Sequence, residues 1–407
     1  AAISCAALMT GCVEENFEQN NKRPQLKEGE ILFGAYAGFE DGNAKTRTSY
    51  GDVSDLDDNG KGHVIINWEA NDKLEIACPQ ASNQTKKAVY IVTEEKYTAG
   101  SWDNQGDGKS KATYLTRESS EVGLQWGDLA TAHTFYAMYP ASTQFSTEES
   151  AGISLSKDGV ITGYLPLNQT VSTSSITQTN GNYVVEPDMR FAYMVAKTVI
   201  PKDKVANAAK NDTGVTLSFM PIVTALQFDI TAGTIGVVNQ GTDNVIAINS
   251  VQLFSESGQN ISGEFSCDLN TISSSGYPTC VDRNTGSVND RITMTFNALS
   301  PSEKVVLGSG KKMEITFFVL PTASFEDGNS DLKLQIMFTL NGVVQTKTVT
   351  LGKEIQAHKK YYFRNLTLPD LTTLNATASN WFGSIDDDVL VNQLSIPGAG
   401  NAASSAS

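Results

Sequence analysis

Short runs in which apolar and polar residues alternate dominate the chain between residues 27 and 368. Gly, Asn, Asp, Ser or Pro bounds each run, and sustained helical spacing is scarce. A period of two is typical of β-strands that bury one face, so the pattern predicts an all-β protein made of sandwiches. The clearest runs are 88–93, 134–139, 159–165, 191–195, 215–219, 225–231, 244–254, 291–296, 313–320, 332–340 and 343–351.

Two more strands are predicted near the start, at 31–37 and 64–76, with the basic segment 43–48 between them. Exposed loops of small and polar residues are where proteases cut most readily. A cut here would separate the first strand from the chain that follows. A sandwich that loses a strand exposes an apolar groove and unpaired backbone groups, which a strand from another molecule can fill. The pattern therefore indicates a route to assembly by strand addition.

The strand runs fall into two groups, which predicts two domains. Residues 201–213 are polar and poor in β-branched residues, as expected of a linker or of one helical turn at the surface. We therefore expect one sandwich at 27–200 and a second at 213–368, both of ordinary domain size. Within the second, Asn341 and Gly342 join two alternating runs and predict a two-residue hairpin turn, because both tolerate positive φ angles.

The first twelve residues are mostly apolar and end in a small residue followed by Cys12. This arrangement is typical of the last part of a bacterial lipoprotein signal, cut short at its front, with Cys12 as the lipidated first residue of the mature protein. The alternative is a short apolar helix, but the run 1–12 is too short to span a bilayer. The polar residues 13–26 would be a tether, and the protein would be exported and lipid-anchored to the outer membrane or cell surface.

Composition and charge narrow the class of protein further. The 407 residues carry a net charge of -15, with 18% charged and 40% hydrophobic residues. The hydrophobic fraction is that of a folded protein rather than a disordered one. Because so acidic a chain has little with which to neutralise phosphates, we expect no nucleic-acid partner.

Three of the five cysteines remain once the signal and the lipidated residue are set aside: Cys78, Cys267 and Cys280. Cys267 and Cys280 are near enough in sequence to close a small disulfide loop in an oxidising compartment. The alternative is that both pack as small hydrophobic residues.

No motif for catalysis, for a cofactor or for a metal stands out, so we predict no enzyme activity, no cofactor and no metal site. Residues 55–60 begin like a calcium loop, but Ile66 stands at the twelfth position, where a Glu is needed, and a solvated turn is the better interpretation. Trp102 and Trp126 lie in polar segments, where an aromatic ring can stack on a sugar.

The order of several segments resembles the fimbrillin family of Bacteroidales, the Mfa-like group of surface lipoproteins and pilus subunits. The resemblance spans about residues 8–368, and one departure is Pro221, where the family often has a His. The matching segments are the lipobox at Cys12, 45–48 ahead of 67–74, 135–140, 163–169, 215–230, 261–265, 317–321 and 359–363.

This resemblance implies two tandem transthyretin-like β-sandwich domains and, in pilus-forming members, removal of the first strand by an Arg-directed protease. On this chain the cut would follow Arg47, with Arg23 as the alternative. The other interpretation of Arg47 is an ordinary loop arginine in an uncleaved surface lipoprotein. The implied partners are outer-membrane lipid through Cys12, other fimbrillin-like subunits by strand addition, and ligands on host or bacterial surfaces.

The C-terminal residues 369–407 predict no strand, and 369–379 are linker-like. Residues 380–401 resemble the opening of a phosphatidylinositol-specific phospholipase C X-like domain, whose general acid–base His is replaced here by Gly400, and a neighbouring Asp by Asn401. Neither replacement can transfer a proton. Two hypotheses follow: a structural or adhesive fimbrillin-type lipoprotein that assembles after cleavage at Arg47, or the non-catalytic spacer or binding module of a larger lipoprotein with a phospholipase-like domain.

Overall fold

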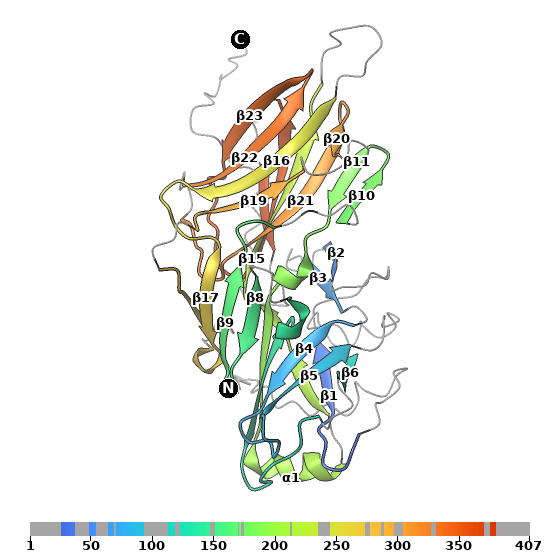
Figure 1. The fold of residues 1–407 in the computed structure, drawn as a ribbon, viewed down its shortest axis with the longest axis vertical. Helices are drawn as coiled ribbons and strands as arrows, with labels where there is room; N and C mark the ends of the chain where they lie inside the picture. Colours follow the sequence, from blue (N-terminus) through green and yellow to red (C-terminus); the bar gives the residue numbers. More distant parts are fainter. Residues whose placement is uncertain are drawn as a thin grey trace, which may run out of the picture.

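The fold is that of a computed structural model, in which strands joined by short loops make up almost the whole of the described chain (Figure 1). This confirms the expectation of an all-β protein. Within the described residues, no helix is long and apolar enough to cross a bilayer. The described residues are 26–36, 49–53, 64–68, 71–92, 113–118, 123–146, 151–169, 171, 175–211, 214–234, 245–272, 277–285, 289–296, 304–326, 331–369 and 375–379.

The largest sheet has eight strands and occupies the lower half of Figure 1. The sheet curls so that its seventh strand lies beside its first: the Thr198 hydroxyl of the seventh strand donates a hydrogen bond to the Thr216 carbonyl oxygen of the first at 2.8 Å. Its strands, in spatial order, are β13 (Val215–Ser218), β1 (Phe33–Tyr36), β6 (Thr113–Arg117), β5 (Lys87–Val92), β4 (Lys73–Ala77), β7 (His133–Tyr139), β12 (Met194–Ile200) and β14 (Met220–Pro221).

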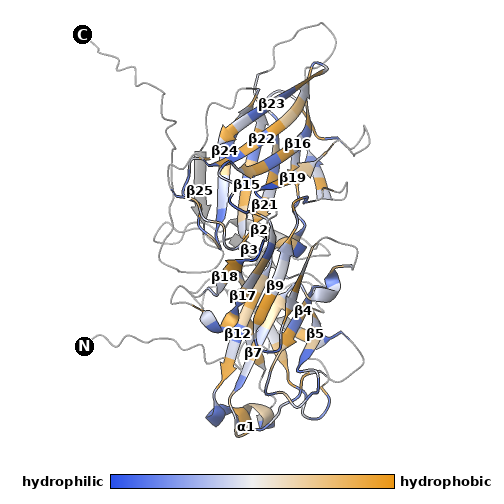
Figure 2. Cartoon of the chain, turned by 60° about the vertical axis from the view of Figure 1, so that its left-hand side comes forward, coloured by the Kyte–Doolittle hydropathy of each residue, from blue (hydrophilic) through white to orange (hydrophobic). Residues whose placement is uncertain are grey.

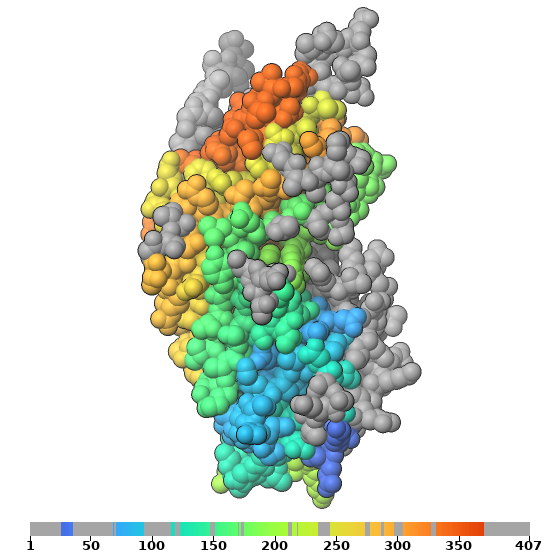
Figure 3. All heavy atoms as spheres, viewed as in Figure 1, coloured from blue at the N-terminus to red at the C-terminus, as the bar shows by residue number. Residues whose placement is uncertain are grey.

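A four-stranded sheet covers one face of this large sheet, and the Tyr136 hydroxyl of β7 donates to the side-chain oxygen of Asn270 at 2.6 Å. The sheet joins segments from both sides of residues 201–213, since β9 pairs with β17. Figure 3 shows the yellow and orange atoms of β17 and β18 beside the green atoms of β8 and β9. Its strands, in order, are β18 (Thr279–Asp282), β17 (Gly263–Asp268), β9 (Val160–Leu165) and β8 (Gly152–Leu155).

Two further sheets face each other in the upper half of Figure 1. The first has six strands: β10 (Ile176–Thr179), β11 (Asn182–Val185), β21 (Lys312–Val319), β15 (Thr224–Ala232), β24 (Lys360–Leu368) and β25 (Asn375–Ser379). The second has five: β19 (Arg291–Thr295), β16 (Ile246–Ser255), β22 (Leu332–Leu340), β23 (Val343–Thr350) and, paired to β16, β20 (Val306–Leu307). A separate pair is β2 (Ser49–Val53) with β3 (Val64–Asn67).

Alternation along the strands explains why these sheets pack face to face. In β15, Leu226, Phe228 and Ile230 are fully buried, whereas Gln227 and Asp229 between them are half-buried. Figure 2 shows the same interleaving of hydrophobic and hydrophilic positions along the strands. Side chains of a strand point alternately to its two faces, so the period of two selects the buried face.

Two hairpins turn on the same dipeptide. Asn341 and Gly342 have φ angles of 52° and 78° and join β22 to β23, which confirms the predicted turn. Asn180 and Gly181 do the same between β10 and β11, a hairpin that the sequence analysis missed. Both dipeptides meet the positive φ angles that a type I′ turn requires.

The buried side chains form two clusters, and strand β7 contributes to both. Phe135, Ala137 and Tyr139 belong to the smaller cluster, inside the curled sheet, whereas Tyr136 and Met138 face the larger one. The larger cluster runs from beneath β7 through the four-stranded sheet into the upper half of the molecule. The two halves of the described chain therefore share one continuous apolar core.

Three segments differ from the sequence predictions. Residues 201–213 contain helix α1 (Lys202–Asn211), which buries Val205 and Ala208. The run 64–76 splits into β3 and β4, and Asn71, ahead of β4, has a φ of 73°. Residues 375–379, predicted as linker, form β25 beside β24. Short one-turn 3-10 helices complete the described elements: Ser142–Gln144, Met189–Phe191 and Leu269–Thr271.

Candidate functional site

The candidate site is the place that β1 occupies in the large sheet. Although β1 is the first strand of the chain, it does not lie at an edge: it pairs antiparallel with β6 and parallel with β13. The backbone N–H of Val215 donates to the Leu32 carbonyl oxygen at 2.8 Å just before the parallel register begins. We call residues 26–36 the arm. The strands β6 and β13, together with the other residues that contact the arm, form what we call the first-strand slot.

The arm fills the slot with apolar side chains. Ile31, Phe33 and Ala35 are 1%, 0% and 0% exposed and belong to the smaller cluster. The Phe33 ring lies edge-on to Tyr90 and Phe135, with centroids 5.0 and 5.5 Å away. Burying large apolar side chains stabilises by about 2 kcal/mol each, so the arm contributes on the order of 5 kcal/mol through Ile31, Phe33 and the smaller side chains near them.

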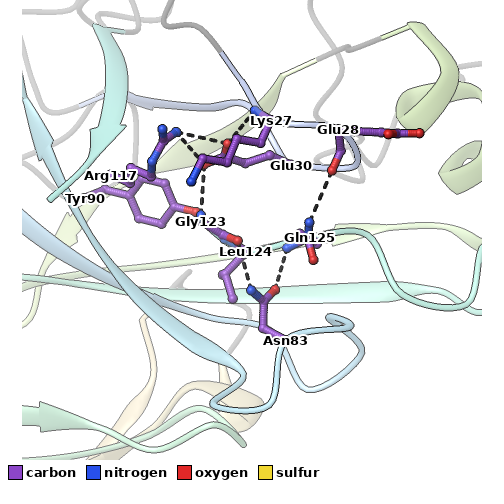
Figure 4. A network of polar contacts seen from close by, with 9 residues as sticks. All are labelled: Lys27, Glu28, Glu30, Asn83, Tyr90, Arg117, Gly123, Leu124 and Gln125. Carbon is purple, nitrogen blue, oxygen red and sulfur yellow. Dashed lines mark hydrogen bonds and ion pairs between the residues drawn. The ribbon is translucent and has the colours of Figure 1, made fainter. Parts of the chain in front are cut away.

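A buried ion pair holds the start of the arm (Figure 4). Both carboxylate oxygens of Glu30 lie 3.0 Å from the Arg117 guanidinium, and Glu30 Oε1 also accepts a hydrogen bond from the Gly123 N–H at 2.9 Å. Its other oxygen accepts from the Lys27 N–H at 2.8 Å. The Glu30 side chain is 2% exposed and that of Arg117 24%. We call the contact of Glu30 with Arg117 and the Gly123 N–H the latch.

Backbone hydrogen bonds extend the latch along the arm. The Gly29 carbonyl oxygen accepts from the Trp126 N–H at 3.0 Å, and the Ile31 N–H donates to the Leu124 carbonyl oxygen at 2.9 Å. Asn83 fixes the opposite side, donating to the Gly123 carbonyl at 2.9 Å and accepting from the Gln125 N–H at 2.6 Å (Figure 4). Residues 123–126 are therefore held on one side by the arm and on the other by Asn83.

Two residues give the latch its tight geometry. A Cβ at Gly123 would lie 2.4 Å from Glu30 Oε1 and 2.8 Å from the Tyr90 hydroxyl, so only glycine lets the backbone N–H reach the carboxylate. The Tyr90 hydroxyl accepts from the Leu124 N–H at 2.8 Å, and burial raises the pKa of Tyr90. A charge-assisted bond in so dry a setting is stronger than one in water.

Within the described residues, the Nε of Arg117 is buried and has no hydrogen-bond partner. The guanidinium thus depends on the Glu30 carboxylate for its compensation. Breaking a buried ion pair by removing one partner leaves an uncompensated charge, which costs more than the pair contributes.

Trp126, one of the two tryptophans considered for sugar stacking, packs beside the slot instead. Its ring lies 5.2 Å from His133 and 5.9 Å from Phe135. His133 donates from Nδ1 to the Thr131 carbonyl and accepts at Nε2 from the Gly127 N–H, and burial lowers its pKa. The neutral imidazole therefore fixes the segment that carries Trp126.

The remaining predicted residues are distributed as follows. Cys12, Arg23 and Arg47 lie outside the described residues, as do Trp102 and residues 55–60. Cys267 and Cys280, opposite one another in β17 and β18, are joined by a disulfide. Cys78 is free and buried, and burial raises the pKa of its thiol to about 11.

No family model matches the chain, and no curated protein matches it. Among solved structures, it is similar to a candidate cell adhesion protein from Bacteroides uniformis, at 14% identity and a TM-score of 0.47, with 88% of this chain and 100% of that chain covered. It is also similar to a candidate cell adhesion protein from Bacteroides ovatus, at 14% identity and a TM-score of 0.43, with 85% of this chain and 100% of that chain covered. A third similar structure is the C-terminally truncated tip fimbrial protein Mfa3 from Porphyromonas gingivalis, at 10% identity and a TM-score of 0.33, with 86% of this chain and 99% of that chain covered.

These names agree with the family that the sequence resembles. The strand predicted at 31–37 is present as β1, whereas the latch was not predicted. The available signal was an acidic residue directly before an apolar run, and nothing in the sequence paired it with Arg117, 87 residues further on.

Proposed function

We propose that this chain is a structural and adhesive cell-surface protein of the fimbrillin type that joins its partners by exchange of the first strand. The observation that carries the proposal is the insertion of β1 between β6 and β13. Loss of β1 would leave two strands with unpaired backbone groups and empty the space that Phe33 fills beside Tyr90 and Phe135. A strand from a second subunit would pair these backbone groups and fill this space, as in β-strand addition.

The position of the cut decides whether the strand is freed. A cut after Arg23 leaves the arm attached to the rest of the chain, since Arg23 precedes residue 26. A cut after Arg47 falls between β1 and β2 and leaves the arm held by non-covalent contacts alone. We therefore propose Arg47 as the processing site.

The proposed lipid anchor has a consequence for this order of events. Cys12 precedes the arm in the sequence, so a cut after Arg47 separates the lipid from the body of the protein as well as freeing the strand. In this proposal the uncut protein is held at the outer membrane or cell surface, and the cut protein passes to other subunits. Ligands on host or bacterial surfaces would be bound by the assembled form.

Limited digestion of the full chain with an Arg-specific protease tests the proposal. We expect mass spectrometry to find cleavage after Arg47, and electron microscopy and light scattering to find oligomers once the arm has left. Arg47→Gln should remain uncut and monomeric, and Arg23→Gln, the matched control, should behave like the wild type. A completely cut protein that stays monomeric after release of the arm would refute assembly by strand exchange.

Lipid labelling in the bacterial host tests the anchor separately. We expect Cys12→Ala to abolish incorporation of a labelled fatty acid, because only the lipobox cysteine accepts the lipid. Cys78→Ala, a change at a buried free thiol, should keep the label. Undiminished labelling of Cys12→Ala would show that Cys12 is not the anchor.

A further inference from the structure

We propose that the latch selects the incoming strand: once the arm has left, Arg117 and the Gly123 N–H form a carboxylate-binding site at the entrance of the slot. The occupant is an extended strand of a partner subunit with an Asp or Glu directly before its first buried apolar residue. This inference rests on the proposed strand exchange and adds to it the chemistry of the partner.

The groups left behind by the arm make the slot selective. The Lys27 N–H that also binds Glu30 belongs to the arm and departs with it. Arg117 and the Gly123 N–H stay, on β6 and on the segment that Asn83 fixes. Two donors aimed at one point, one of them a guanidinium, favour an anionic acceptor.

The site discriminates between incoming strands through the cost of leaving Arg117 unpaired as much as through its attraction for a carboxylate. A strand that brings a neutral or basic residue to this point covers the slot and leaves the Arg117 side chain, which is only 24% exposed, without a counter-charge. Its Nε already has no partner among the described residues. A buried unpaired charge is strongly unfavourable, and specificity commonly relies on such penalties against the wrong partner.

The slot also fixes the spacing that a partner strand must have. Counting from Glu30, the apolar side chains at the first three positions, Ile31, Leu32 and Phe33, are buried, and so is the small side chain at the fifth, Ala35; the first, third and fifth face the smaller cluster. The third position is the most demanding, because Phe33 contacts two aromatic rings. The site therefore recognises an acidic residue followed by an apolar strand with a bulky third and a small fifth residue.

The test uses the full chain cut between β1 and β2, with labelled peptides of residues 26–38 offered in excess and their binding followed by fluorescence anisotropy. The probes are the wild-type peptide, Glu30→Gln and Glu28→Gln. Glu28 is the matched control, since it is exposed and only its backbone carbonyl contacts the 123–126 segment. The same peptides are offered to a cut chain carrying Arg117→Gln.

We expect Glu30→Gln to bind at least about tenfold more weakly than the wild-type peptide, as for loss of a charged hydrogen-bonded contact, and Glu28→Gln to bind equally well. On Arg117→Gln the wild-type and Glu30→Gln peptides should bind alike. Equal binding of the two to the unaltered cut chain would overturn the carboxylate site and leave strand exchange standing. If no peptide binds, strand exchange fails and the site with it. If Arg117→Gln does not fold, the peptide comparison on the unaltered chain alone decides.

Discussion

Replacing Phe33 with Ala should remove much of what keeps β1 in place. The Phe33 side chain is fully buried and lies edge-on to Tyr90 and Phe135 at 5.0 and 5.5 Å. Truncation of a buried Phe to Ala costs about 3 to 5 kcal/mol, and each edge-to-face aromatic pair accounts for about 0.5 to 1.5 kcal/mol. That is a large share of the roughly 5 to 15 kcal/mol by which folded proteins are stable.

Urea unfolding and native-state hydrogen exchange measure this effect. We expect the unfolding midpoint to fall and the amides of residues 31–36 to exchange faster in Phe33→Ala. Val343→Ala is the matched control: Val343 is 60% exposed on β23, so its loss should stay within about 0.5 kcal/mol. If Phe33→Ala costs less than about 1 kcal/mol, the tight packing of the first strand is wrong.

Three other predictions concern stability. Burial lowers the pKa of His358 to about 4, while the unfolded chain keeps a pKa of 6.5. The free energy of unfolding should therefore fall by about 2 to 3 kcal/mol as pH drops from 6.5 to 4. His358→Asn, which tolerates the local φ of 65°, should flatten a pH series of unfolding midpoints. Reduction of the Cys267–Cys280 disulfide, which closes a loop of 13 residues, should cost about 3 kcal/mol; a double Ala variant should melt at the same temperature with and without reductant. Gly123→Ala should destabilise by about 1 to 3 kcal/mol in urea because its Cβ would meet a latch oxygen at 2.4 Å, whereas Gly308→Ala, with 3.8 Å to its nearest neighbour, should be neutral.

Strands with one buried face could be predicted from the sequence, whereas two of the mostly exposed strands could not. β15 from Leu226 onward and β22 as far as Phe338 alternate between buried and half-buried positions, so their period of two is visible in the residues. β10 (Ile176–Thr179) and β18 (Thr279–Asp282) are mostly exposed along their length and carry no such signal. Their place is set by pairing with neighbouring strands rather than by their own pattern.

Pairing between strands that lie far apart in the sequence could not be predicted either. β9 pairs with β17 and β11 with β21, and both pairs join segments on opposite sides of residues 201–213. A single sequence gives the strands but not their partners. The same limit applies to the latch: Glu30 before an apolar run is a local feature, whereas its contact with Arg117 exists only once β1 lies beside β6.

The division of the core explains how a molecule of this kind could lose its first strand without unfolding. Ile31, Phe33 and Ala35 belong to the smaller cluster, and no residue of the arm is part of the larger one. Strand β7 separates the two, since its side chains alternate between them. Departure of the arm would therefore open the inside of the curled sheet while the continuous core behind β7 stays closed. Because apolar burial is a local contribution, the energy lost is that of the slot alone, and an incoming strand that restores those contacts also restores the fold.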